Sequence, residues 1–199
     1  MKKILLIILT IILILSVNVL AVDIDIGVPA EDYTGSWCHG TLINKSNPAN
    51  ASGQITTVQI YSKVNMIEVT VAIFYRPDPT GFPNNLSTRE GGNVYLSDLL
   101  APGYHNFVGV TLNVVEGDFI GVEYTNGDIE KKVGGEQGLW YMNYQDHVPC
   151  DNQTFYFQAN NAIAIYGTGT TNVGWPHKWN TKTISKWNTK EFTKWNGLE

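Results

Sequence analysis

Residues 107–124 read FVGVTLNVVEGDFIGVEY, and this stretch decides the fold class. Apolar residues stand at every second position over 108–114, and the same alternation resumes over 120–124. A period of two places one face of a strand in the core and the other in water, which is typical of antiparallel sheets. The residues between, Glu116-Gly117-Asp118, have turn chemistry, because glycine tolerates positive φ and aspartate bonds nearby backbone. The stretch predicts a β-hairpin at the heart of a β-sandwich.

Short strand patterns separated by turn residues continue on both sides of this hairpin. The clearest of them covers residues 67–75, where every second residue is apolar. Residues 22–169 carry eight or nine such strands and no convincing amphipathic helix. This predicts an all-β, antiparallel, jelly-roll-like β-sandwich. An immunoglobulin-type domain is the alternative, but Cys38 and Cys150 lie too far apart for its usual bridge between sheets.

Residues 1–21 have the pattern of a signal peptide. Two lysines precede an almost unbroken run of Ile and Leu, and small residues up to Ala21 offer a cleavage site. An uncleaved membrane anchor is the alternative, because the run approaches the roughly 20 apolar residues that span a bilayer. Ser16 and Asn18 weaken that alternative. We therefore expect a secreted or cell-surface protein that meets a membrane only through this segment.

The charge of the chain narrows the choice of partners. The formal net charge is −5, and loss of Lys2 and Lys3 with a signal peptide makes it more negative. A negative surface repels phosphate backbones, which argues against nucleic acid as the main partner. Aromatic residues make up 12 % of the chain, which suits a β protein that shows rings at its surface.

Two cysteines, Cys38 and Cys150, invite a disulfide. An even count in an exported protein favours a bridge, and this one would join the first strand to a loop near the last. Closing so long a loop stabilises by about 4–5 kcal/mol in the chain-entropy model. A zinc site is the alternative, because His39 and His147 are near the two cysteines, but an adjacent Cys-His pair is poorly spaced for one tetrahedral ion.

Residues 170–199 form a tail with an eight-residue repeat. KWNTKTIS begins at position 178, KWNTKEFT at 186 and a third copy, KWNGLE, at 194. An even period places Trp179, Trp187 and Trp195 on one face of an extended chain. Three readings stay open: a flap that covers the sandwich, a tail used for assembly or docking, and disorder.

Rings and hydrogen-bonding side chains gather after residue 139, which suggests a carbohydrate site. Trp and Tyr rings stack on the apolar faces of sugars, while Asn and Asp bond the hydroxyls around them. The alternative is that these rings fill the core. With Trp37 brought close by the expected disulfide, the candidate ligand-binding residues are Trp37, Trp140, Tyr141, Asn143, Tyr144 and Asp146.

Catalytic signals are weaker. Glu68 and Glu123 stand opposite the apolar positions of their strands, so they could line an open sheet face as a glycosidase pair. An outward glutamate on a strand is more often simply solvated. The sequence has no nucleophile elbow, zinc-protease motif or phosphate-cradling loop, so we expect no catalytic residue, metal or cofactor. A calcium ion near Asp146–Asp151 is not required by any spacing there.

Four motifs of the domain and two of the tail carry a resemblance to known domains. They are QITTVQIY (54–61), VEGDFIG (115–121), GLWY (138–141) and AIAIYGTG (162–169), with ISKWN (184–188) and KWNG (194–197) in the tail. The run from Gly53 to Gly169 resembles β-sandwich domains of surface proteins and phage-type structural proteins. The tail looks like short repeats that end some virion or appendage proteins. The resemblance implies a sandwich fold, while a signal peptide is unusual for a virion part and favours a cell-surface protein.

These observations lead to three functional hypotheses. The first is a non-catalytic module that binds carbohydrate or another surface ligand through exposed rings. The second is a structural or adhesive subunit that assembles through its tail. The third is a glycosidase that uses Glu68 and Glu123.

Overall fold

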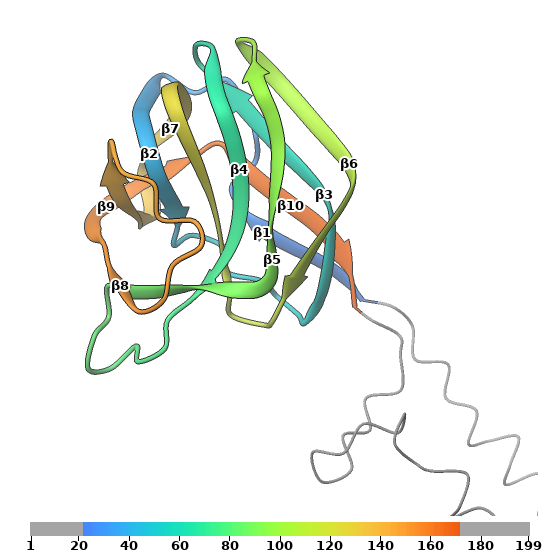
Figure 1. Ribbon diagram of the computed structural model, residues 1–199, viewed down its shortest axis with the longest axis vertical. Coiled ribbons are helices and arrows are strands. Elements are labelled where there is room, and N and C mark those ends of the chain that lie inside the picture. Colours follow the sequence, from blue (N-terminus) through green and yellow to red (C-terminus); the bar gives the residue numbers. More distant parts are fainter. Residues whose placement is uncertain (1–21, 172–199) are drawn as a thin grey trace, which may run out of the picture.

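Ten β-strands and no helix make up residues 22–171, the part of the chain that the computed structural model describes (Figure 1). The strands are β1 (Asp23–Gly27), β2 (Gly35–Asn44), β3 (Gly53–Ser62), β4 (Met66–Tyr75), β5 (Asn85–Leu100), β6 (Gly103–Val114), β7 (Phe119–Asn143), β8 (Gln153–Thr154), β9 (Tyr156–Ile163) and β10 (Ile165–Thr170). The predicted all-β class is confirmed, with ten strands in place of eight or nine. The predicted signal segment and the repeats of the tail lie outside the described residues. Within residues 22–171 there is no helix long and apolar enough to cross a membrane.

The strands form one curled sheet that closes over its own core, as a β-sandwich does. One side of it runs β1-β10-β3-β6, and β4 joins β5 to β7 on the other. Figure 1 shows β4 and β5 standing across from β3 and β10. The strands β1 and β10 pair antiparallel from Asp23 to Gly27, so the two ends of the described chain lie side by side. This architecture is consistent with the predicted sandwich.

The stretch that predicted a hairpin forms two strands, but those strands do not pair with each other. β6 pairs with β3, while the first part of β7 pairs with β4. The predicted turn is present, because the Asp118 N–H donates to the Val115 carbonyl at 2.9 Å and Gly117 has a φ of 86°. The prediction of a hairpin was therefore wrong in its pairing: the turn carries the chain between the two sides of the sheet.

A buried carboxylate holds this corner in place. Asp118 is 3 % exposed, and its two oxygens accept hydrogen bonds from Arg89 Nε at 2.8 Å and Nη2 at 2.6 Å. The Val115 N–H also donates to it, at 2.8 Å. A bidentate guanidinium and a backbone amide supply the donors that a buried carboxylate needs. The fixed corner separates β6 from β7 instead of folding them together.

The alternation in β6 changes face partway along the strand. Val108 is 73 % exposed, whereas Leu112 is fully buried. The register with β3 shifts between Ile55 and Thr57, and Gly109 in β6 has a φ of 79°. An irregularity of this kind re-aims the side chains beyond it. The pattern over 108–114 therefore does not mark one continuous buried face.

β7 is a single long strand, whereas the sequence shows clear alternation only near its start, over residues 120–124. Its two ends both pair with β2, so that Leu42 lies opposite Val122 along one edge and opposite Tyr141 along the other. The last part of β7 also pairs with β9, which places Tyr141 beside Tyr156. The middle of β7 is polar and contains glycines, so its apolar alternation is weak and the sequence there is typical of a loop. It is nevertheless a strand, because residues 131–136 pair with β9.

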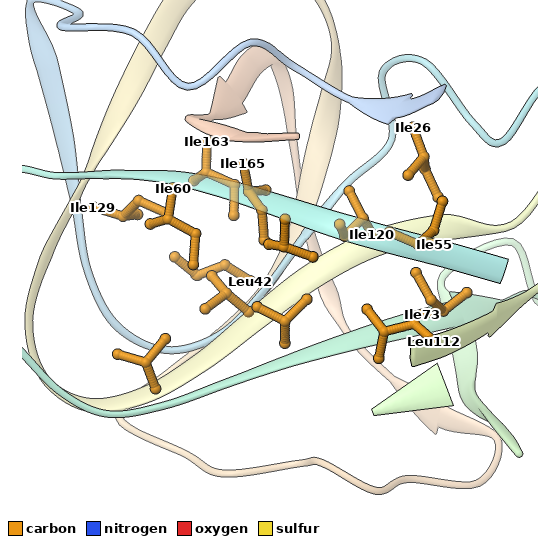
Figure 2. Close-up of a cluster of buried hydrophobic side chains, with 14 of the residues drawn as sticks. Ile26, Leu42, Ile55, Ile60, Ile73, Leu112, Ile120, Ile129, Ile163 and Ile165 are labelled. Atoms are coloured by element: carbon orange, nitrogen blue, oxygen red, sulfur yellow. The ribbon is translucent and has the colours of Figure 1, made fainter. Parts of the chain in front are cut away.

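Aliphatic side chains from both sides of the sheet fill the main core. Figure 2 shows isoleucines of β1, β3, β7 and β10 meeting Leu42 of β2 and Leu112 of β6. Burying each such side chain stabilises the fold by about 1.5–3 kcal/mol. A smaller cluster beside it is mainly aromatic and contains Phe74, Phe119, Trp140 and Phe155.

One buried polar side chain completes the backbone hydrogen bonding where strands part. Asn44 is 1 % exposed; its amide nitrogen donates to the Ile163 carbonyl at 2.9 Å, and its amide oxygen accepts from the Ile163 N–H at 2.8 Å. The Asn44 side chain thus makes the two backbone hydrogen bonds to Ile163 that a neighbouring strand would otherwise make. Unpaired backbone groups in a core are costly, so the contact is a structural requirement.

We expect Asn44→Ala to lower the free energy of unfolding by about 2–4 kcal/mol, because it leaves both backbone groups of Ile163 buried and unpaired. Urea denaturation followed by tryptophan fluorescence measures this. Asn106→Ala, at an exposed position of β6, is the control and should change stability by less than about 0.5 kcal/mol. Equal losses in the two variants would contradict the role given to Asn44.

Candidate functional site

The side chains of Trp37, Tyr141, Asn143, Tyr144 and Tyr156 form what we call the aromatic surface. Trp37 comes from β2, Tyr141 and Asn143 from the end of β7, and Tyr156 from the start of β9. Pairing of β7 with both β2 and β9 brings these three strands together. Tyr156 is 65 % exposed and Tyr144 69 %, so two rings of the set are open to water.

Direct contacts fix the geometry of this surface. The rings of Trp37 and Tyr141 are 5.0 Å apart between centroids, with an angle of 57° between their planes. Tyr141 and Tyr156 are 5.7 Å apart and tilted by 33°. The Trp37 indole N–H donates to Asn143 Oδ1 at 2.8 Å. The Lys131 ammonium lies 4.9 Å from the centre of the Trp37 ring. The three rings therefore form a continuous row with defined orientations.

Tyr144 stands at the end of β7 and is held by β2. Its N–H donates to the His39 carbonyl at 3.0 Å, and its ring meets the His39 ring edge-on at 4.7 Å. Its φ of 62° turns the chain away from the sheet directly after Asn143. A hydrogen bond to the Cys38 thiol raises the pKa of the Tyr144 phenol. The ring is thus positioned although it is exposed.

Trp140 does not belong to this surface, and its predicted role as a stacking ring needs correction. It is 1 % exposed and packs edge-on against Phe119 at 5.0 Å, in the smaller core cluster. Successive side chains of a strand point to opposite faces, so Trp140 enters the smaller cluster, whereas Tyr141 is partly buried and packs against the main core. The indole N–H is satisfied by Asn84 Oδ1 at 3.0 Å. Trp140 is a core residue, as the alternative interpretation of the rings supposed.

Asp146 lies in the loop that follows the aromatic surface, and Glu123 anchors that loop. Asp146 is exposed. The Glu123 carboxylate is half-buried on β7; it accepts hydrogen bonds from the Thr41 hydroxyl at 2.9 Å, the Val148 N–H at 2.8 Å and the His147 N–H. These contacts use Glu123 as a clamp for the backbone around Asp146.

The two carboxylates of the glycosidase hypothesis have different surroundings. Glu68 is exposed on β4 with a φ of 55°, beside β5. A hydrogen bond to Asp98 raises the pKa of Tyr95 in β5 to about 12, and the charge of Glu68 adds to this. The Glu123 carboxylate, in contrast, is half-buried and bonds the backbone of the loop at His147 and Val148. Among the described residues no hydrogen bond joins Glu68 to Glu123, and the hypothesis stays a prediction.

The predicted disulfide is not formed, because both cysteines are free. Cys38 is beside Tyr144 and pairs in register with Asp128 of β7. Cys150 packs against β5, where its N–H donates to the Thr88 hydroxyl at 2.9 Å, and burial raises the pKa of its thiol. The two thiols thus sit against different strands. Trp37 reaches Tyr141 through the pairing of β2 with β7 and not through a bridge. No group of three or more metal-ligating side chains gathers within residues 22–171.

The sequence interpretation missed Tyr156, a member of the aromatic surface, and Lys131, whose ammonium lies over the Trp37 ring. Tyr156 is outside the cluster of rings that follows residue 139 in the sequence, and only its pairing with Tyr141 shows where its ring lies. Its neighbour Phe157 lies opposite Trp140, on the other face. The sequence did carry a signal. Residues 156–157, like residues 140–141, are two adjacent aromatic residues of a strand, so one ring of each pair points to each face.

Comparison with known protein families, with curated proteins and with solved structures finds no match for this chain. The resemblance to domains of surface and phage-type structural proteins therefore stays a prediction beyond the all-β sandwich-like fold.

We expect the stability of the fold to depend on the protonation of Glu123. Burial raises its pKa, and the hydrogen bonds from Thr41, His147 and Val148 oppose this only in part. Protonation therefore stabilises the folded state, fully below the ordinary pKa of 4.5, and this contribution is lost as the pH rises through the raised value. Urea unfolding at a series of pH values should show the wild-type chain losing stability over this window relative to Glu123→Gln.

Glu90→Gln is the control for this measurement, because Glu90 is exposed on β5. Its stability should follow that of the wild-type chain over the same window. A wild-type curve parallel to that of Glu123→Gln would show that Glu123 does not titrate differently in the folded state.

Proposed function

We propose that this domain is a non-catalytic binding module for carbohydrate, and that the aromatic surface is its ligand site. The observation that carries the proposal is the row of Trp37, Tyr141 and Tyr156, with Asn143 beside it. An exported location, which rests on residues 1–21, is part of the same proposal. The proposed site contains Trp37, Tyr141, Asn143, Tyr144, Asp146 and Tyr156. Trp140 is not part of it, because it is buried.

The chemistry of sugars favours this use of the surface. A pyranose ring has a face of C–H groups and a rim of hydroxyls, so it needs an apolar plane bordered by hydrogen-bonding groups. Tyr156 and Tyr144 supply exposed rings, and the exposed carboxylate of Asp146 follows Tyr144 along the chain. The Trp37 indole N–H is bonded to Asn143, and the Lys131 ammonium lies over its ring. The role of Trp37 is therefore to orient its neighbours, and the exposed tyrosines offer the faces for stacking.

The surface is also held before any ligand arrives. Trp37 is tied to Asn143, Tyr144 to His39, and the loop beyond to Glu123. Rigid rings lose little conformational freedom on binding, which lowers the cost of association. A surface made for a large apolar partner would have few polar groups at its centre. The polar atoms here support a hydroxyl-rich ligand instead.

Tyr156→Ala should weaken retention on immobilised oligosaccharides by about tenfold, which corresponds to about 1.4 kcal/mol, because it removes an exposed stacking ring. A glycan array identifies the retained sugar, and affinity chromatography on that sugar measures the change. Tyr104→Ala is the matched control, since Tyr104 is 51 % exposed but belongs to β6. Retention unchanged in Tyr156→Ala, with both variants folded, would show that the aromatic surface is not the site.

A second candidate function is assembly through the tail, and the position of the chain ends favours it. The Thr171 N–H donates to the Val22 carbonyl at 3.0 Å, and the Val22 N–H donates to the Thr171 hydroxyl at 2.9 Å. The repeats with Trp179, Trp187 and Trp195 therefore follow a point fixed on the pair formed by the edge strand β1 and its neighbour β10. Attachment at one fixed point suits a segment that joins the domain to a partner.

Deleting residues 172–199 tests this second function. If the tail assembles the protein, light scattering should give a higher mass for the full chain than for the shortened one. Replacing the three repeat tryptophans by alanine in the full chain separates their contribution from the loss of length, and should give the low mass. Equal masses for the full and shortened chains would contradict assembly through the tail.

A further inference from the structure

A second candidate site lies in a groove of about 430 Å³ on another part of the surface. It is bordered by the end of β1, by the turn at Ser46 and Asn47, by the bend of β7 over residues 132–137 and by Tyr166 of β10. This volume falls within the range of roughly 300–1,000 Å³ that is usual for small-molecule sites. None of these residues belongs to the aromatic surface.

The walls of the groove are tied to one another. The Gly27 N–H donates to the Asn47 carbonyl at 2.8 Å, and Asn47 Nδ2 returns a bond to the Gly27 carbonyl at 3.0 Å. The Gln137 N–H donates to the Ser46 hydroxyl at 2.9 Å, which joins the bend of β7 to the same turn. The groove is therefore preformed, so binding a ligand carries little free-energy cost for ordering its walls.

The Asp25 carboxylate in the groove is only loosely satisfied by the protein. Asp25 Oδ2 accepts from Asn47 Nδ2 at 3.4 Å and from the Tyr166 hydroxyl at 3.5 Å, both near the outer limit for a hydrogen bond. Asp25 Oδ1 and the side-chain amide of Gln137 have no hydrogen-bond partner among residues 22–171. Lys132 and Glu136 form an ion pair at 2.7 Å on the wall formed by β7.

The balance of these groups indicates the chemistry of the ligand. Two carboxylates, Asp25 and Glu136, and one ammonium, Lys132, give the groove a formal charge of −1, which disfavours an anion. The groove holds amide, phenol and ammonium donors together with carboxylate acceptors, and a hydroxyl can satisfy both kinds at once. The half-buried Tyr166 ring adds an apolar face.

We propose that this groove is a second saccharide-binding site, for a neutral, hydroxyl-rich sugar unit, in which Asp25 is the main acceptor and Asn47, Gln137 and Tyr166 provide the other contacts. Lys131 reaches Trp37 of the aromatic surface, whereas Lys132 lines the groove. Neighbouring side chains of a strand point to opposite faces, so the two sites open on different sides of β7. A molecule with both sites can hold two glycan chains at once. The groove stands on its own contacts and does not depend on the aromatic surface.

Chemical-shift titration of the backbone amides tests the groove with defined probes: the methyl glycosides of glucose, mannose, galactose and N-acetylglucosamine. At least one should produce saturable shifts at Gly27, Asn47, Gly135 and Gln137. Asp25→Asn should weaken that binding about tenfold. Asp23→Asn is the matched control, because it makes the same charge change on the same strand at an exposed position outside the groove. Tyr156→Ala should leave the groove shifts unchanged, which separates this site from the aromatic surface.

Gln137→Ala, at an exposed side chain, gives a second variant should Asp25→Asn fail to fold, and it should weaken binding as well. Saturable shifts with none of the glycosides would overturn the proposal. So would shifts confined to the aromatic surface, or equal affinities for Asp23→Asn and Asp25→Asn. If ethanolamine shifts the groove amides and no glycoside does, the groove is a cation site and the proposal is wrong.

Discussion

The pairing of β2 with both ends of β7 is the constraint on which the rest of this structure depends. One strand takes hydrogen bonds from two segments of a single neighbour, so Leu42 is enclosed between Val122 and Tyr141 and is fully buried. The same arrangement sets Trp37 against Tyr141 and Thr41 against Glu123. The burial of Leu42, the contact of Trp37 with Tyr141 and the contact of Thr41 with Glu123 are thus consequences of one pairing, and none of them needs a disulfide.

Buried and half-buried carboxylates serve this architecture as acceptors. Asp118 fixes the corner between β6 and β7, and Glu123 fixes the loop after β7. Glu130 is 1 % exposed and is paired with Lys63 at 2.7 Å, although its second oxygen has no partner among the described residues. Such groups are tolerated inside only when they are bonded, which explains why each one joins segments distant in sequence.

The two proposed ligand sites use different means of recognition. The aromatic surface offers rings at an open edge and suits a chain that lies across it. The groove offers a preformed set of donors and acceptors and suits a single sugar unit. Adjacent residues of β7 point to the two sites: Lys131 contacts Trp37 of the aromatic surface, and Lys132 lines the groove. Successive side chains of a strand point to opposite faces, so the two sites lie on opposite faces of β7. A β-sandwich can therefore present two unlike sites without any further domain.

Local features were within reach of the sequence alone. The period-two alternation predicted the all-β class, and Glu116-Gly117-Asp118 predicted a turn that is present, because strand faces and turn conformations depend on near neighbours. Pairing depends on distant segments, so only the tertiary structure separated β6 from β7 and placed Tyr156 beside Tyr141. The face taken by Trp140 was beyond the sequence for the same reason. Alternation says that Trp140 and Tyr141 point apart, but only the tertiary structure places Trp140 in the smaller cluster with Phe119 and Phe155 and leaves Tyr141 partly buried against the main core. The groove is wholly tertiary, since its walls come from four segments that no local pattern connects.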